Sequence, residues 1–161
     1  VLVKNPMIKS AQVYYSLDGY IHVNIQQREP VLRVLTGEGY YVDRDGRVMP
    51  LSSKFTSRVV VATGDINKKF ACEKLGPFAM KLKNEPFWDA YIEQLVVRSN
   101  EDVVMIPKVG DFRIVLGKVD DCDARLEKLI LFLKDGITKK GWNRYKEINL
   151  KFDNQVVCVR K

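Results

Sequence analysis

Three short apolar runs in the middle of the chain decide its fold: Tyr91 to Arg98 (YIEQLVVR), Val103 to Pro107 (VVMIP) and Phe112 to Leu116 (FRIVL). All three are rich in the β-branched and aromatic residues that favour strands. The links between them, Ser99-Asn100-Glu101 and Val109-Gly110-Asp111, are too short to hold a crossover helix. The sequence therefore predicts an antiparallel meander of three strands.

The segment before this meander predicts a helix and several further strands. Apolar residues in Asp65 to Glu85 recur along one helical stripe, with a break or kink expected at Gly76-Pro77 because proline has no backbone N–H. Pro86-Phe87-Trp88 is expected to end this helix. The strands expected upstream are Val31 to Leu35, the hairpin of Tyr40 to Val42 with Arg47 to Met49, and the buried strand Arg58 to Thr63.

The clearest helix follows the meander, from Asp121 to Asp135. Acidic residues at its start complement the positive end of the helix dipole, and Gly136 is expected to end it in the left-handed conformation. We expect its apolar stripe to lie across the sheet as the main cover of the domain. The stripe is Leu126, Leu129, Ile130 and Leu133, at the helical spacing i, i+3, i+4, i+7.

Two strands close the chain, Tyr145 to Phe152 and Gln155 to Arg160, with a turn at Asp153-Asn154. No further strand follows the second one, so we expect it at an edge of the sheet, where free backbone groups can pair with a partner strand. The alternative is an interior strand with a merely solvated Lys151. The predicted partner-binding residues are Lys151, to meet a partner carboxylate, Phe152, to pack on an apolar partner side chain, Asn154, to hold the turn, and the strand residues Val156, Val157, Cys158 and Val159.

The chain opens with another hairpin, in which Ala11 to Tyr15 and Ile21 to Gln26 alternate apolar and polar residues around the turn Leu17-Asp18-Gly19. Before it, Asn5-Pro6 is expected to stop a helix of which only Val1 to Lys4 remain. So short a segment cannot bury a core alone. We therefore expect its apolar face to be mobile or packed on a neighbouring copy; the face consists of Val13, Tyr15, Ile21, Val23 and Ile25.

Composition excludes several classes of protein. The 161 residues are 46% hydrophobic and 29% charged, which suits a folded domain. No apolar run reaches the roughly 18 residues that a transmembrane helix needs. The net charge is +7, and residues 136–161 hold seven basic and two acidic side chains, a net +5. Three cysteines without a CxxC pair disfavour a zinc site, so no metal or cofactor is predicted.

No catalytic constellation is apparent. His22 is the single histidine, and on the polar face of a strand it is more simply a surface residue than part of a Cys–His or Ser–His pair. Thr36 to Gly39 lacks the rest of a phosphate loop, and Asp43 to Gly46 lacks the later glutamate of a calcium loop. Asp120 to Asp123 is more simply a helix start than a cation site. The sequence therefore offers no candidate catalytic site.

A basic and aromatic cluster near the C-terminus is the best candidate for binding single-stranded nucleic acid. No recognised nucleic-acid-binding motif accompanies it, and a solvated loop with Trp142 packed on the core is the simpler interpretation. The cluster consists of Lys139, Lys140, Trp142, Arg144, Tyr145 and Lys146. A basic nucleic-acid-binding module is therefore the second hypothesis of function, and a hydrolase with an inconspicuous site is the third.

Four segments together resemble the extracytoplasmic part of the bacterial cell-division family FtsQ/DivIB. Asn5 to Val13 and Ile25 to Val31 are similar to the patterns NP-x-V-x-x-A-x-V and V-x-x-R-x-P at the end of the family's POTRA domain. Tyr41 to Gly46 resembles the D-x-x-G hairpin that opens its β domain, and Ile148 to Phe152 resembles its terminal strand. The stretches Lys-Gly-Trp-Asn and Asn-Gln-Val-Val-Cys around that strand are similar to the Bacteroidetes branch.

This resemblance implies an α+β fold: a truncated POTRA hairpin in residues 1–30, then a mostly antiparallel sheet covered by helices in residues 31–161. It implies a non-enzymatic scaffold of the divisome that binds the small bitopic proteins FtsB and FtsL at its terminal strand and helps to assemble and regulate septal peptidoglycan synthesis. It also implies an anchor in the inner membrane through one N-terminal helix absent from this sequence, with the present region in the periplasm, and no nucleic-acid partner.

Overall fold

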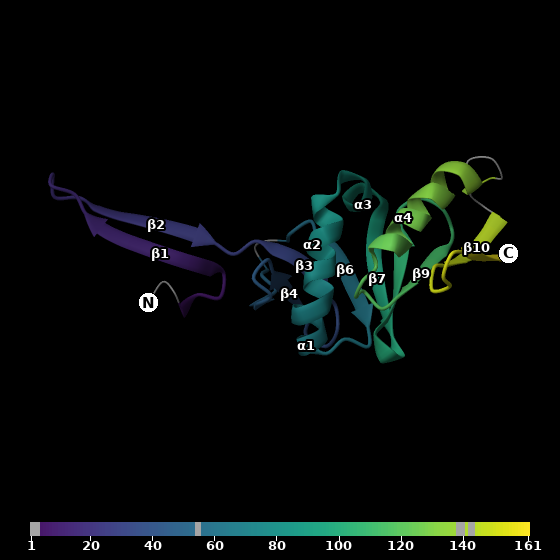
Figure 1. The fold of residues 1–161 in the computed structure, drawn as a ribbon. Helices are drawn as coiled ribbons and strands as arrows, with labels where there is room; N and C mark the ends of the chain where they lie inside the picture. Colours follow the sequence, from purple (N-terminus) through teal and green to yellow (C-terminus); the bar gives the residue numbers. More distant parts are fainter. Residues whose placement is uncertain (1–3, 54–55, 138–140, 142–143) are drawn as a thin grey trace.

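The computed structural model describes residues 4–53, 56–137, 141 and 144–161 (Figure 1). The strands are β1 (Ile8–Tyr15), β2 (Ile21–Gln27), β3 (Pro30–Val34), β4 (Tyr40–Asp43), β5 (Val48–Pro50), β6 (Val60–Gly64), β7 (Ile92–Arg98), β8 (Asp102–Pro107), β9 (Arg113–Gly117), β10 (Tyr145–Asn149) and β11 (Val157–Arg160). The helices are α1 (Lys68–Phe70), α2 (Gly76–Asn84), α3 (Pro86–Tyr91) and α4 (Asp123–Leu131), with π-helical turns at Ala71–Leu75 and Phe132–Ile137 and a 3₁₀ turn at Ser99–Glu101.

The described strands form two sheets, the β1–β2 hairpin and a nine-stranded sheet in the order β11-β10-β9-β8-β7-β6-β3-β4-β5. The antiparallel pairs β7–β8 and β8–β9 confirm the predicted meander. Three pairs are parallel: β3–β6, β6–β7 and β9–β10. Helices lie between β6 and β7 and between β9 and β10 in the chain, which gives the length that a parallel crossover needs. The fold is α+β with a mostly antiparallel sheet, as the sequence predicts.

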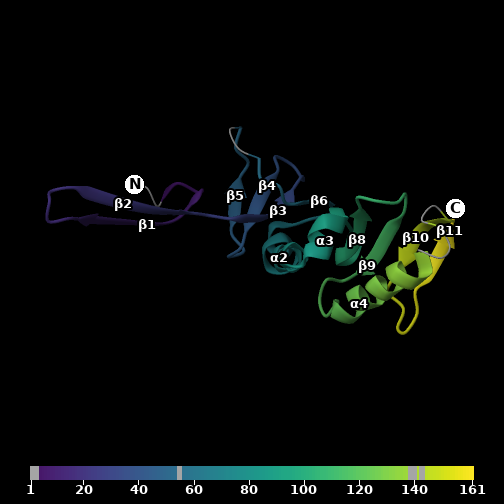
Figure 2. The same ribbon diagram turned by 90° about the horizontal axis from the view of Figure 1, so that it is seen from above.

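The main core lies between one face of the large sheet and the helices (Figure 2). On α4 and the turn that follows it, Leu126, Leu129 and Leu133 are buried, and Ile130 is partly buried against the same core. The predicted stripe is therefore confirmed as a cover of the sheet.

The first long helix begins later than the sequence predicts and changes its form near its middle. It begins at Lys68, after Asn67, whose Oδ1 accepts a hydrogen bond of 2.8 Å from the Phe70 N–H. At Gly76-Pro77, where a break or kink was expected, the helix is not broken but changes its form. The chain widens into a π-helical turn at Ala71–Leu75, and Pro77 then occupies the first turn of α2, where its missing N–H costs no helical hydrogen bond.

Of two other expected helix ends, the one at Pro86 is confirmed and the one at Gly136 is wrong. Pro86-Phe87-Trp88 ends α2 but also forms the first turn of α3, because proline fits the first position of a helix. Trp88 is thereby buried in the core, and the following strand begins at Ile92. Gly136 does not end α4, since a π-helical turn carries the helix through it to Ile137.

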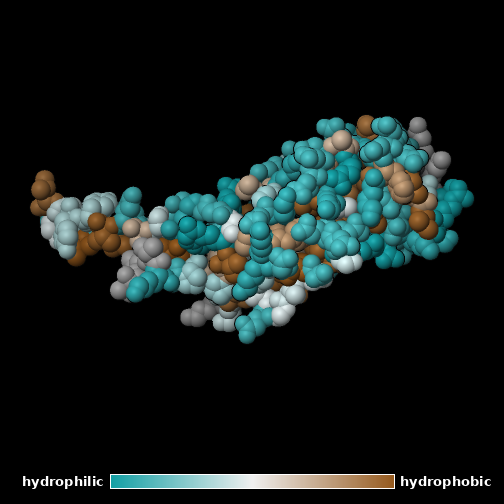
Figure 3. Space-filling model, turned by 60° about the horizontal axis from the view of Figure 1, so that its bottom comes forward, coloured by the Kyte–Doolittle hydropathy of each residue, from teal (hydrophilic) through white to brown (hydrophobic). Residues whose placement is uncertain are grey.

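The β1–β2 hairpin forms as predicted and projects from the large sheet (Figures 1 and 2). Its register places Val13 opposite Val23 and Tyr15 opposite Ile21. All four of these apolar side chains are exposed, and hydrophobic surface is visible on the narrow, projecting end of the molecule in Figure 3. Whether the hairpin is mobile or packs on another copy stays a prediction. The helical remnant expected at Val1 to Lys4 lies largely outside the described residues. No helix within the described part of the chain is long and apolar enough to span a membrane.

Candidate partner-binding edge

The last strand, β11, lies at one edge of the nine-stranded sheet. Its antiparallel register places Cys158 opposite Ile148 and Val157 opposite Asn149 of β10. Among the described strands, β10 is its only neighbour. One side of β11 is therefore an open backbone edge. Both terminal strands are shorter than expected, because the chain leaves the ladder at Asn149 and rejoins it at Val157.

Apolar side chains lie on both faces of this edge strand. Val156 and Cys158 are partly buried and pack against the main core. Val157 and Val159, on the opposite face, are 36% and 40% exposed. Burial raises the pKa of the Cys158 thiol. A strand added to this edge would therefore meet apolar surface on both sides.

Helix α4 holds the loop between β10 and β11 in place. The Lys128 ammonium donates hydrogen bonds of 3.2 Å to the Leu150 carbonyl and 2.6 Å to the Phe152 carbonyl. Nearby, the Phe132 and Tyr145 rings pack at 6.2 Å between centroids. These contacts fix the edge before any partner arrives, which lowers the ordering cost of binding.

The loop residues predicted from the sequence follow β10, and the side chain of Lys151 reaches across β9 to β8, away from the free edge of β11. Lys151, expected to meet a partner carboxylate, already pairs with Asp102 of β8 at 3.1 Å, and its side chain stays 48% exposed. The Phe152 side chain is 47% exposed. Asn154 has a φ of 58°, a left-handed conformation that asparagine tolerates better than most residues.

Basic groups surround the end of β11. The Lys161 ammonium lies 2.7 Å from a carboxylate oxygen of Asp111, and this contact holds the pKa of Asp111 below its usual value. Arg144 and Lys146 are exposed. The other members of the predicted nucleic-acid cluster, Lys139, Lys140 and Trp142, lie outside the described residues.

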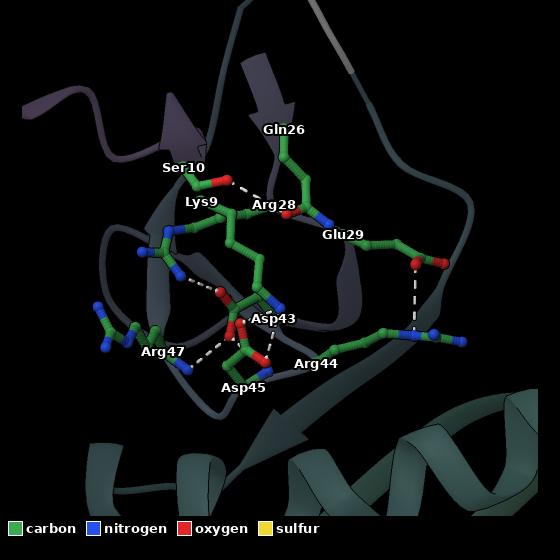
Figure 4. Close-up of polar contacts among 9 residues, drawn as sticks. All are labelled: Lys9, Ser10, Gln26, Arg28, Glu29, Asp43, Arg44, Asp45 and Arg47. Atoms are coloured by element: carbon green, nitrogen blue, oxygen red, sulfur yellow. Dashed lines mark hydrogen bonds and ion pairs between the residues drawn. The ribbon is translucent and has the colours of Figure 1, made fainter. Parts of the chain in front are cut away.

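A buried ion pair that no sequence pattern predicts lies toward the other end of the large sheet (Figure 4). Asp43 is the one buried charged residue among those that the structure describes, and its Oδ2 accepts a 2.7 Å hydrogen bond from the Arg28 guanidinium. Both residues stand in motifs that the sequence already singled out, the R-x-P and D-x-x-G patterns. Because Arg28 and Asp43 lie 15 positions apart in the chain, no local spacing pattern predicts their contact.

Among the described residues, the arrangement most similar to an activated nucleophile lies at the tip of the β1–β2 hairpin. His22 Nε2 is 3.2 Å from Ser16 Oγ, and Ser16 also bonds to the Asp18 carboxylate. A catalytic triad needs the carboxylate on the far nitrogen of the histidine, whereas here it contacts the serine. His22 instead stacks on Tyr14 at 5.0 Å between centroids. No cluster of three metal-ligating side chains occurs within the described ranges.

A comparison with protein-family models matches residues 29–159 to the family described as FtsQ/DivIB, C-terminal related. The chain belongs to this family. FtsQ/DivIB proteins are membrane-anchored, non-enzymatic cell-division proteins, and membership indicates a scaffold role in division. A comparison with curated proteins finds no match. The part of the chain that matches FtsQ/DivIB begins just before β3 and ends within β11.

Proposed function

We propose that the protein is a non-enzymatic scaffold of the divisome that captures an extended segment of a small bitopic division protein, FtsB-like or FtsL-like, at the free edge of β11. Through this contact it helps to assemble and regulate the septal peptidoglycan synthesis machinery. The observation that carries the proposal is the open backbone edge of β11, flanked by apolar side chains on both faces. Main-chain hydrogen bonds supply affinity in such strand addition, and the flanking side chains supply specificity.

The surrounding charge favours an acidic segment as the partner. Residues 136–161 have a net charge of +5, which would speed the approach of an acidic peptide. Lys151 would exchange its contact with Asp102 for a partner carboxylate, and Phe152 would pack on an apolar partner side chain. Asn154 would hold the turn that presents both.

We further propose that residues 1–30 are the C-terminal part of a POTRA domain and residues 31–161 the β domain. The hairpin forms a sheet of its own, and the family match begins at Glu29, which supports this division. The family's architecture supports a periplasmic location, with a single membrane-spanning helix N-terminal to this region in the inner membrane.

The test is a pair of proline substitutions, Val157→Pro and Cys158→Pro. Successive N–H groups of an edge strand point alternately to the neighbouring strand and to the free side. One of the two variants should therefore break the ladder with β10, and the other should remove a free-edge donor while the fold remains. In calorimetric titration with the ectodomain of the FtsB-like protein from the same organism, this second variant should lose about tenfold or more in affinity.

Val13→Ser, on the exposed face of the hairpin, is the matched surface control and should bind like the wild type. The proposal is wrong if a folded free-edge proline variant binds with unchanged affinity. It is also wrong if the wild type does not bind the ectodomain and instead binds single-stranded DNA with an affinity that falls steeply as salt rises, as phosphate neutralisation requires.

A further inference from the structure

The hairpin and the large sheet meet at a joint with a single backbone crossing. Only Arg28 and Glu29 separate β2 from β3. Ile8, at the base of the hairpin, is buried but is not part of the main hydrophobic core. A small interface with little apolar contact leaves two units free to move by default. The orientation of the hairpin therefore depends on the polar contacts at the joint.

The centre of the joint is the carboxylate of Asp43, whose two oxygens have different tasks (Figure 4). Oδ1 accepts the N–H groups of Asp45 at 2.9 Å and Arg47 at 2.7 Å, which closes the β4–β5 turn. Oδ2 accepts a hydrogen bond of 2.7 Å from the Arg28 guanidinium. The side chain of Asp43 is 1% exposed and that of Arg28 is 12% exposed. One residue thus shapes the turn and also holds the end of the hairpin.

Three further ion pairs, all closer to solvent, surround this buried pair. Lys9 Nζ lies 2.8 Å from Asp45, and Lys9 is the extra residue of a β-bulge in β1, a feature that re-aims side chains. Glu29 pairs with Arg44 at 3.3 Å and with Lys83 of α2 at 3.1 Å. The hydrogen bond from Lys9 lowers the pKa of Asp45, and the one from Lys83 lowers the pKa of Glu29. The Lys9 pair links β1 of the hairpin to the turn after β4, and the pairs of Arg28 and Glu29 link the two-residue connection after β2 to the large sheet or to α2.

We propose that this set of ion pairs is an electrostatic joint that fixes the angle between the hairpin unit and the β domain. The buried Arg28–Asp43 pair is the pivot, and the pairs of Lys9 and Glu29 limit rotation about it. The hairpin and β11 lie at opposite ends of the molecule (Figure 1). The joint therefore sets where the free edge stands relative to the N-terminal unit, and salt weakens its outer pairs. This inference does not depend on the proposed partner.

The test measures the distance distribution between spin labels on Leu17, at the hairpin tip, and Leu35, in the β domain, by pulsed electron resonance. Both side chains are exposed, and labels attached through non-canonical amino acids leave the three cysteines intact. The wild type should give one narrow peak at about 0.01 M salt. That peak should broaden at about 1 M salt, where the screening length falls from about 30 Å to about 3 Å.

Asp43→Asn is the decisive variant, because its remaining Oδ1 can still close the turn while the ion pair to Arg28 is lost. It should lose the narrow peak at every salt concentration. Lys9→Glu should broaden the peak at low salt, and the double swap Lys9→Glu with Asp45→Lys should restore it. These two exposed positions leave the core untouched, so the test survives if Asp43→Asn fails to fold. A narrow peak unchanged in folded Asp43→Asn, or a swap that restores nothing, overturns the proposal.

Discussion

Truncating Leu129 tests whether α4 covers the sheet as the structure places it. The side chain is fully buried in the main core, where it lies in the stripe with Leu126 and Leu133. Leucine to alanine removes about three carbon groups, worth about 0.8 kcal/mol each, or about 2.4 kcal/mol of transfer free energy. The cavity left behind raises the expected loss to about 3–5 kcal/mol. For a chain of this size, a loss of 3 kcal/mol lowers the melting temperature by about 6–12 °C.

The assay is thermal and urea unfolding followed by far-ultraviolet circular dichroism. The matched control is Leu131→Ala on the same helix, because Leu131 is 63% exposed and its truncation leaves no cavity. The control should lose less than about 1 kcal/mol. If Leu129→Ala shifts the urea midpoint no more than Leu131→Ala does, α4 does not pack on the sheet in this way.

Three further perturbations test other parts of the fold. Gly64 has a φ of +106°, and an added Cβ would lie 2.0 Å from the Val97 carbonyl oxygen, so Gly64→Ala should lower the free energy of unfolding in urea by at least about 2 kcal/mol. Gly37→Ala, whose added Cβ would meet no neighbouring atom, should lower it less. Equal losses of stability would contradict the contact at Gly64. Burial raises the pKa of the Cys158 thiol, so the protonated thiol contributes stability below its ordinary pKa of 9.0, and this contribution is lost as pH rises through the folded-state pKa. Iodoacetamide at about pH 7 should therefore label Cys158 more slowly in the folded protein than in urea. Equal labelling rates would show an exposed thiol. Lys128→Met should accelerate amide exchange in the β10–β11 loop and leave α4 protected, because only the two loop carbonyls lose their donor; unchanged exchange would show that the lysine does not hold the loop.

Local patterns predict most of the elements because each one is decided by near neighbours in the chain. Alternation in Ala11 to Tyr15 reports the face of a strand directly. The stripe through Leu129 reports the buried face of α4 in the same way. The short links after Arg98 and Pro107 allow only antiparallel pairing, and the meander follows from them. The expected position of β11 at a sheet edge agrees with the structure, where β10 is its only neighbour among the described strands.

Proline and glycine positions predict helix boundaries only in part, because the effect of each residue on the helix depends on the segments beside it. Pro86 stops one helix and begins another, and nothing before it distinguishes the two outcomes. Pro77 is tolerated because a π-helical turn precedes it. Gly136 lies inside a second π-helical turn and not at a left-handed cap.

Contacts between distant segments could not be predicted from spacing. The Arg28–Asp43 pair and the contact of Lys128 with the Leu150 carbonyl join residues on different elements. Each depends on strand order, and the parallel pairing of β9 with β10 is a property of the whole sheet. The resemblance to a family pointed to Arg28 and Asp43 separately but not to their meeting.

The two edges of the large sheet differ in a way that bears on function. The far edge, β5, has three residues and ends in Pro50, which has no N–H to offer another strand. Natural proteins use such devices to prevent pairing at sheet edges. At the other edge, β11 contains no proline, so its outward-facing N–H groups remain available, and Val157, Cys158 and Val159 are uncharged and favour strands. Within the described residues, one edge is blocked and the other is open, backed by helix α4 and its Lys128 contacts. This asymmetry supports the proposed uptake of a partner strand at β11 alone.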